Sequence, residues 1–167
     1  MKIAIMYDSI TGNTKTIAEA IKEEIDQSNL VYFGAAQKGI EADLYILGSW
    51  TDKGMCSKKI IDVIEELKNK KIANFGTCGL GGSIEYYGKL SNRVKEIIDS
   101  SNEVLGSFYC QGKMPLRVRD KYVKLITQNP EDKDLKVSVE NFNQALSHPD
   151  NDDISNAKQW IKNILAK

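Results

Sequence analysis

The chain has 167 residues, enough for one domain that buries roughly 70% of its unfolded surface, so its stability does not require disulfide bonds. Its 23 Lys and Arg balance its 23 Asp and Glu, which argues against a general nucleic-acid-binding protein. Three cysteines without CxxC spacing, no secretory leader and no apolar run of about 20 residues lead us to expect a cytoplasmic protein that does not enter a membrane.

The first predicted element is an apolar strand over residues 3–7, and a hydroxyl- and glycine-rich turn joins it to a helical pattern. At such a junction the free backbone N–H groups and the positive end of the helix dipole converge, which predicts a phosphate site. Gly12 allows close approach of the backbone, and with only Lys15 beside the turn we favour a terminal phosphomonoester over a di- or triphosphate. The alternative is a simple capped helix start. The turn consists of Ser9, Ile10, Thr11, Gly12, Asn13 and Thr14.

Apolar patterning predicts further strands at 30–33, 43–48, 71–75 and 104–109. Helical spacing follows the first turn, resumes near residue 57 and appears again after Tyr87. Residues 35–42 are too few for a full crossover helix, so we expect the second helix to be reduced to about one turn. The alternation of strands and helices predicts a doubly wound α/β fold with a five-stranded parallel sheet.

The C-terminal third is less regular. Residues 117–127 can form a helix, residues 128–146 show little helical signal, and a final amphipathic helix follows Pro149. We interpret 113–147 as an insertion before the last helix, packed at the sheet's edge within a single domain of residues 1–167.

Two later turns complete a candidate ligand site. The third strand ends in Ser49, Trp50, Thr51 and Asp52, where an exposed indole is costly unless it covers an aromatic face, although Trp50 could instead cap the core. The glycine-rich run 76–83 follows the fourth strand, and because glycine has no side chain we expect its main chain to approach another group closely. Loops after neighbouring parallel strands meet at one edge of the sheet, where ligands bind.

These residues resemble the flavodoxin family, whose S/T-x-T-G-x-T loop, similar to Ser9–Thr14, holds the phosphate of FMN. The resemblance implies the strand order 2-1-3-4-5, FMN as cofactor, and a flavin ring stacked by Trp50 and by Tyr86 or Tyr87. It also implies that amides near Cys78 face the pyrimidine end of the flavin. The implied cofactor-binding residues are Ser9, Ile10, Thr11, Gly12, Asn13, Thr14, Ser49, Trp50, Thr51, Asp52, Thr77, Cys78, Gly79 and Tyr86.

We therefore predict an electron carrier that shuttles electrons between a reductase and an acceptor enzyme, as a monomer or weak dimer. The glycine-rich loop and the inserted tail look like a clostridial-type branch of the family, which suggests a tetrapyrrole reductase as acceptor. One alternative is an NAD(P)H-dependent FMN reductase or quinone reductase. Another is a non-flavin receiver domain, which Asp8 and Lys113 superficially fit but which would need an aspartate where Ser49 stands.

We predict neither catalytic residues nor a metal site. Cys78 has no basic partner nearby in the sequence and is interpreted as a small residue that fills space. The single histidine, His148, lies in a His-Pro turn and is interpreted as a cap or packing residue. The balanced charge departs from the acidic character typical of flavodoxins, which puts their usual docking to basic partners in doubt.

Overall fold

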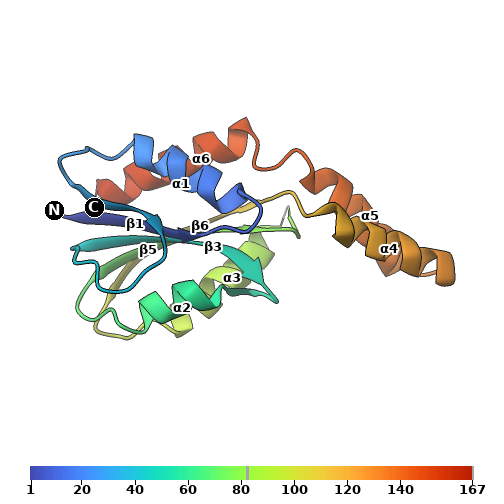
Figure 1. Ribbon diagram of the computed structural model, residues 1–167, viewed down its shortest axis with the longest axis horizontal. Helices are drawn as coiled ribbons and strands as arrows, with labels where there is room; N and C mark the ends of the chain where they lie inside the picture. The colour runs from blue at the N-terminus through green and yellow to red at the C-terminus, as the bar shows by residue number, and fades with distance from the viewer. Residues whose placement is uncertain (82, 167) are drawn as a thin grey trace.

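The computed structural model describes residues 1–81 and 83–166, with a parallel sheet between two helical layers (Figure 1). The sheet order is β2-β1-β3-β5-β6, and every pair of neighbours along it is parallel. This confirms the predicted order, because β5 and β6 are the fourth and fifth parallel strands. The strands are β1 (Ile3–Asp8), β2 (Leu30–Ala35), β3 (Leu44–Asp52), β5 (Lys71–Cys78) and β6 (Glu103–Gln111).

Alternation along the strands explains the two layers. In β1, Ile3 and Ile5 pack beneath α1 (Asn13–Glu23) and α6 (Asn151–Leu165), whereas Ala4 and Met6 face α2 (Lys58–Ile64) and α3 (Ile84–Glu96). All four side chains are buried, as expected for a strand covered on both faces. Figure 1 shows α1 and α6 above the sheet and α2 and α3 below it. No helix among the described residues has the length and apolar character that a membrane crossing requires.

The predicted loop after the third strand is instead a β-hairpin. β3 continues to Asp52 and pairs antiparallel with β4 (Met55–Cys56) through a turn in which Lys53 (φ 48) and Gly54 (φ 80) are both left-handed. These values match a type I′ turn, which follows the twist of the two strands. Arg93 of α3 donates to the carbonyl of Gly54 at 2.9 Å, so the hairpin tip is fixed to the body.

Two helix predictions need correction. Residues 36–43 contain no helical turn, because the chain crosses from β2 to β3 in extended and bent conformations. Tyr86 and Tyr87 lie within α3 rather than before it, since α3 begins at Ile84 after the cap residue Ser83, whose side chain accepts from the Tyr86 N–H.

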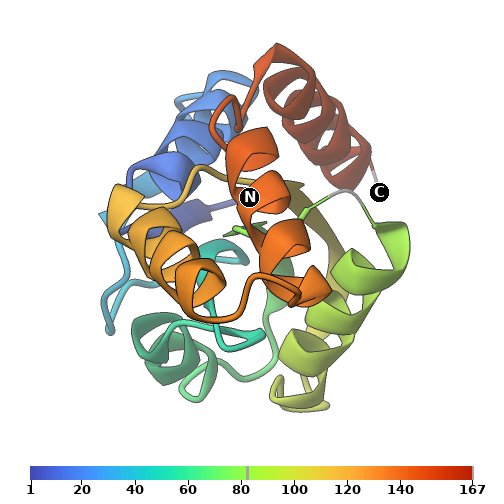
Figure 2. The ribbon, with the colours of Figure 1, turned by 90° about the vertical axis from the view of Figure 1, so that its right-hand side faces the viewer.

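The segment 113–147 forms a helical hairpin beyond the carboxyl ends of the strands (Figure 2). Its first arm, α4 (Leu116–Gln128), was predicted, whereas α5 (Lys133–Ala145) lies in a stretch interpreted as poor in helical signal. The Asp132 side chain caps α5 by accepting from two backbone N–H groups, and Phe142 and Ala145 are buried. α4 has no fully buried residue, so the hairpin leaves most of α4 at the surface.

Candidate functional site

The carboxyl ends of β1, β3 and β5 meet as predicted. Asp8 lies opposite Ser49 in the β1–β3 register, and Trp50 lies opposite Thr77 in the β3–β5 register. Between these ends and the start of α4 is a cavity of about 250 Å³. The cavity is lined by Ile10, Thr11, Asn13, Trp50, Thr51, Thr77, Cys78, Gly79, Gly112, Lys113, Met114, Pro115, Arg117 and Val118.

The first turn presents an open helix N-terminus to this cavity. Gly12 is left-handed (φ 88) and begins α1 without a side-chain cap, and the first turn of α1 holds no acidic residue. Thr11 is exposed and lines the cavity, while the Ser9 hydroxyl accepts from the backbone N–H of Lys15 at 3.3 Å. Backbone N–H groups and the helix dipole are therefore available to an anion here.

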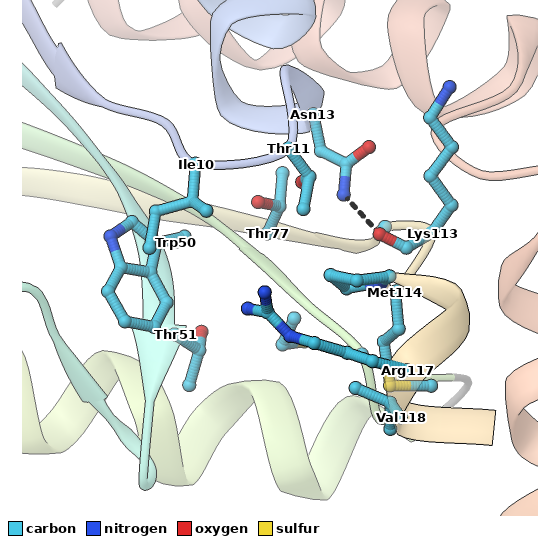
Figure 3. Close-up of a pocket in the computed structure, with 14 residues that line it drawn as sticks. Ile10, Thr11, Asn13, Trp50, Thr51, Thr77, Lys113, Met114, Arg117 and Val118 are labelled. Atoms are coloured by element: carbon cyan, nitrogen blue, oxygen red, sulfur yellow. Dashed lines mark hydrogen bonds between the residues drawn. The ribbon is translucent and has the colours of Figure 1, made fainter. Parts of the chain in front are cut away.

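Two predicted phosphate-binding side chains instead fix the turn in place. The buried Thr14 hydroxyl is 2.9 Å from the Thr77 hydroxyl, which ties the turn to β5. The Asn13 side-chain amide donates to the carbonyl of Lys113 at 2.9 Å, which ties it to the insertion (Figure 3). These side chains shape the turn, so the remaining anion donors are its main chain and the hydroxyls of Ser9, which is half-buried, and Thr11, which is exposed.

Trp50 faces the cavity, where it lies beside Ile10 (Figure 3), and it belongs to neither apolar core. Its indole N–H donates to one oxygen of Asp8 at 2.9 Å, and the Lys59 ammonium lies 3.1 Å from the other oxygen. Partial burial raises the pKa of Asp8, but the indole and the ammonium outweigh this effect and leave the pKa below its ordinary value. Asp8 is therefore a carboxylate near neutral pH and holds the indole in a fixed orientation.

Six of the fourteen predicted site residues do not line the cavity: Ser9, Gly12 and Thr14 of the first turn, and Ser49, Asp52 and Tyr86. The Ser49 side chain is buried and turned inward, where its hydroxyl accepts from the Ser57 N–H at 2.7 Å. Asp52 is exposed at the hairpin, and Tyr86 is half-buried on α3. Tyr87, the alternative to Tyr86, is half-buried on the same helix, so no second aromatic side chain of the described residues lines the cavity beside Trp50.

The main chain of the glycine-rich loop packs closely against the insertion and β6, as its glycines predicted. A Cβ on Gly79 would lie 2.5 Å from the sulfur of Met114. The Gly79 carbonyl accepts from Gln111 of β6 and from Asn141 of α5, each at 3.0 Å. The loop is thus clamped from two sides. Gly82, part of the same predicted loop, lies outside the described residues.

Sequence reasoning missed the wall that the insertion contributes. Met114, Pro115 and Val118 provide apolar surface, and the Arg117 side chain reaches from α4 across the cavity toward Trp50 (Figure 3). The sequence did contain a signal for this wall: a cluster of basic residues directly follows the carboxyl end of the fifth parallel strand, and ligands bind at such strand ends.

Cys78 and His148 are each engaged by the surrounding structure. Burial raises the pKa of Cys78 to about 12, so its thiol stays protonated, consistent with a residue that fills space. The His148 ring is 2.6 Å from Asp153, which forms the capping box of α6 with Asp150. In the described part of the chain these three side chains form the single cluster of metal-ligand type, and capping already engages both carboxylates.

The arrangement suits a flat ligand that carries a phosphate. The open N-terminus of α1 is adapted to the anion, and apolar walls flank the side of the cavity that holds Trp50. Cys78 and Gly79, at the end of β5, supply main chain to the same cavity. The residues present therefore fit FMN, because its phosphate needs an anion site and its ring system needs apolar walls.

Comparison with known proteins agrees with this geometry. A family model described as a flavodoxin domain matches residues 4–162. The chain is 37% identical to the flavodoxin-like domain-containing protein BilS of Clostridioides difficile (strain CD3), over 100% of this chain and 98% of the relative. It is 35% identical to the BilS protein of Clostridium symbiosum (strain WAL-14163), over 96% and 94%. Its fold is similar to the crystal structure of oxidised flavodoxin 2 from Bacillus cereus, with a TM-score of 0.62, 19% identity and 99% of each chain covered.

Proposed function

Because this chain belongs to the flavodoxin family, we propose that it binds one FMN non-covalently and carries electrons between a reductase and an acceptor protein. The bound flavin would supply the redox chemistry, and the protein would supply binding, orientation and electrostatics. The clostridial resemblance makes a tetrapyrrole reductase the first acceptor to test.

The observation that carries this proposal is the open helix N-terminus beside the Trp50 cavity. The main chain of 9–14 would hold the phosphate, because the N-cap residue Gly12 has no side chain to occupy the N–H groups at the start of α1. Trp50, fixed by Asp8, would cover one face of the flavin ring. The amides near Cys78 would donate to the pyrimidine end of the ring, where fixed donors stabilise negative charge.

The cavity lining offers little chemistry of its own, so a redox reaction there would be that of the bound flavin. Among the described residues that line it there is no histidine and no carboxylate, and the only thiol is protonated. A general acid or base for substrate chemistry is therefore missing from this lining. The Arg117 guanidinium does offer a cationic group to a second anion, which supports an NAD(P)H-dependent reductase as the second candidate.

Flavin titration of the purified protein tests the proposal. We expect FMN to bind and to quench tryptophan fluorescence, and riboflavin to bind at least about 100-fold more weakly because it lacks the charge-assisted phosphate contacts. Trp50→Ala should weaken FMN binding about 5- to 150-fold, the cost of about 1–3 kcal/mol for a lost stacking platform. Trp50→Phe should restore most of that affinity.

The matched control is Trp160→Phe. Trp160 packs on Phe108 with ring centroids 6.0 Å apart and does not line the cavity, so its replacement should leave FMN affinity unchanged. Equal affinities for FMN and riboflavin would contradict the proposed phosphate site. Rapid bleaching of the bound flavin by NADH alone would favour the reductase, whereas very slow bleaching supports the carrier.

A further inference from the structure

The segment 113–128 carries a concentration of positive charge that the balanced total charge conceals. Five cations stand against the single acid Asp120, and all six side chains are exposed. On α4, three of the cations follow the spacing i, i+4, i+7, which places them in one row along one side of the helix. The cations are Lys113, Arg117, Arg119, Lys121 and Lys124, and the row consists of Arg117, Lys121 and Lys124.

These charges are not neutralised within the protein. Lysines elsewhere commonly form ion pairs, such as Lys38 with Glu66 at 2.7 Å and Lys162 with Glu24 at 3.1 Å. Within residues 1–81 and 83–166, by contrast, none of the five cations of segment 113–128 forms an ion pair. Like charges at i and i+4, such as Arg117 and Lys121, destabilise a helix, and Asp120 is the one acidic residue of α4 that can offset this cost.

The row begins at the cavity itself. Arg117 lines the cavity and reaches toward Trp50 (Figure 3), and Lys121 and Lys124 continue the row along α4. Figure 2 shows α4 and α5 standing in front of the carboxyl ends of the strands. A macromolecule seated on the row would therefore lie beside the mouth of the cavity.

We infer that this row, with Lys113 and Arg119, is the docking surface for a redox partner protein with an acidic face. The inference rests on the proposed function, because the cavity must hold FMN for docking there to pass electrons. Unpaired cations at the mouth would steer an acidic partner and repel a basic one. The charge of this surface is thus opposite to that of the acidic face typical of flavodoxins.

A protein fits this surface better than a lipid membrane. A helix that binds a membrane surface buries a free apolar face in the lipid. The apolar stripe of α4, formed by Tyr122, Leu125 and Ile126, is already half-buried in a helix that contacts α5. Two apolar side chains of α4, Leu116 and Val123, are exposed, but charged residues make up more of its exposed surface.

The test uses two redox proteins of opposite charge and the FMN-loaded protein. Reduced plant-type [2Fe–2S] ferredoxin, which is acidic, gives one electron per molecule to the oxidised protein. Cytochrome c, which is basic, takes one electron per molecule from the reduced protein. Both reactions are followed by stopped-flow absorption from about 20 mM to about 500 mM NaCl, a range over which exposed charges become screened.

We expect the ferredoxin reaction to slow at least about tenfold as salt rises, and the cytochrome c reaction to accelerate or stay constant. The variant Lys121→Gln/Lys124→Gln should slow the ferredoxin reaction roughly 3- to 10-fold at low salt and flatten its salt dependence. The matched control, Lys133→Gln/Lys136→Gln, removes the same charge from α5, where neither lysine forms an ion pair in the described chain. Its rates should stay close to those of the unmodified protein.

The two proposals fail in different ways. If the protein binds FMN but the ferredoxin reaction shows no salt dependence, or the control variant slows it as much as the test variant, the docking surface is wrong and the FMN site stands. The inference would also be overturned, in favour of a membrane surface, if the unmodified protein sedimented with phosphatidylserine vesicles and the variant Lys121→Gln/Lys124→Gln did not. If no FMN binds, both proposals fall.

Discussion

The hydrogen bond between the hydroxyls of Thr14 and Thr77 gives a quantitative test of how the site is held together. The oxygens are 2.9 Å apart, and the two residues are 1% and 3% exposed, so neither hydroxyl can turn to water. Thr14→Val or Thr77→Val keeps the shape but leaves the other hydroxyl unsatisfied, which costs about 1–3 kcal/mol. Thr14→Val/Thr77→Val removes both hydroxyls, so we expect its cost to be at least about 0.5–1.5 kcal/mol smaller than the sum of the single costs.

Urea unfolding of the four proteins without flavin measures this coupling. Thr127→Val is the control, because its hydroxyl donates to a carbonyl on the exposed α4 and its replacement should change the free energy of unfolding by no more than about 0.5 kcal/mol. Each single variant should also weaken FMN binding, since the phosphate turn loses its tie to β5. Costs that add within about 0.3 kcal/mol would refute the reasoning.

Three further predictions concern the core, the thiols and pH. Gly48→Ala should cost about 1–3 kcal/mol in urea unfolding, because its Cβ would lie 2.1 Å from the ring of buried Phe75. Cys78, whose pKa burial raises to about 12, should react with Ellman's reagent only after unfolding; fast reaction in the native state would contradict this. The pKa of Asp8 lies below its ordinary value of 3.8, so the ionised carboxylate stabilises the folded protein at pH values above 3.8. This stability is lost as the pH falls below that value, so Asp8→Asn should flatten the decline of the unfolding midpoint below about pH 4.

Local sequence patterns were sufficient for the parallel sheet and for the turn that joins β1 to α1. The strands could be predicted as buried because apolar residues such as Ile3 and Met6 occupy both of their faces. A pattern of this kind involves only a few neighbouring residues. Gly12 sits where the sequence placed it, as the left-handed residue that begins α1. Both features arise from interactions along a short stretch of chain.

The features that sequence reasoning missed depend on longer-range contacts or on unfavourable local conformations. The β3–β4 hairpin needs a left-handed lysine, Lys53, which the Arg93 contact to the hairpin tip helps to hold. Helix α5 has few buried residues, but Asp132 caps it and Asn141 binds the Gly79 carbonyl. The contacts of Arg93 and Asn141 join residues far apart in the chain and cannot be inferred from spacing, whereas the Asp132 cap is a local signal that sequence reasoning overlooked.

The distribution of charge shows the same limit. A balanced total charge put docking by electrostatic attraction in doubt, because the sequence does not reveal which cations are neutralised. Many lysines on the body of the molecule, such as Lys89, lie against acids, whereas within the described residues those along α4 form no ion pair. Since exposed ion pairs cancel most of each other's field, the unpaired cations beside the cavity determine the potential that an approaching protein meets. If the proposed function holds, the segment 113–128 would give a chain of balanced charge a basic surface beside its flavin site.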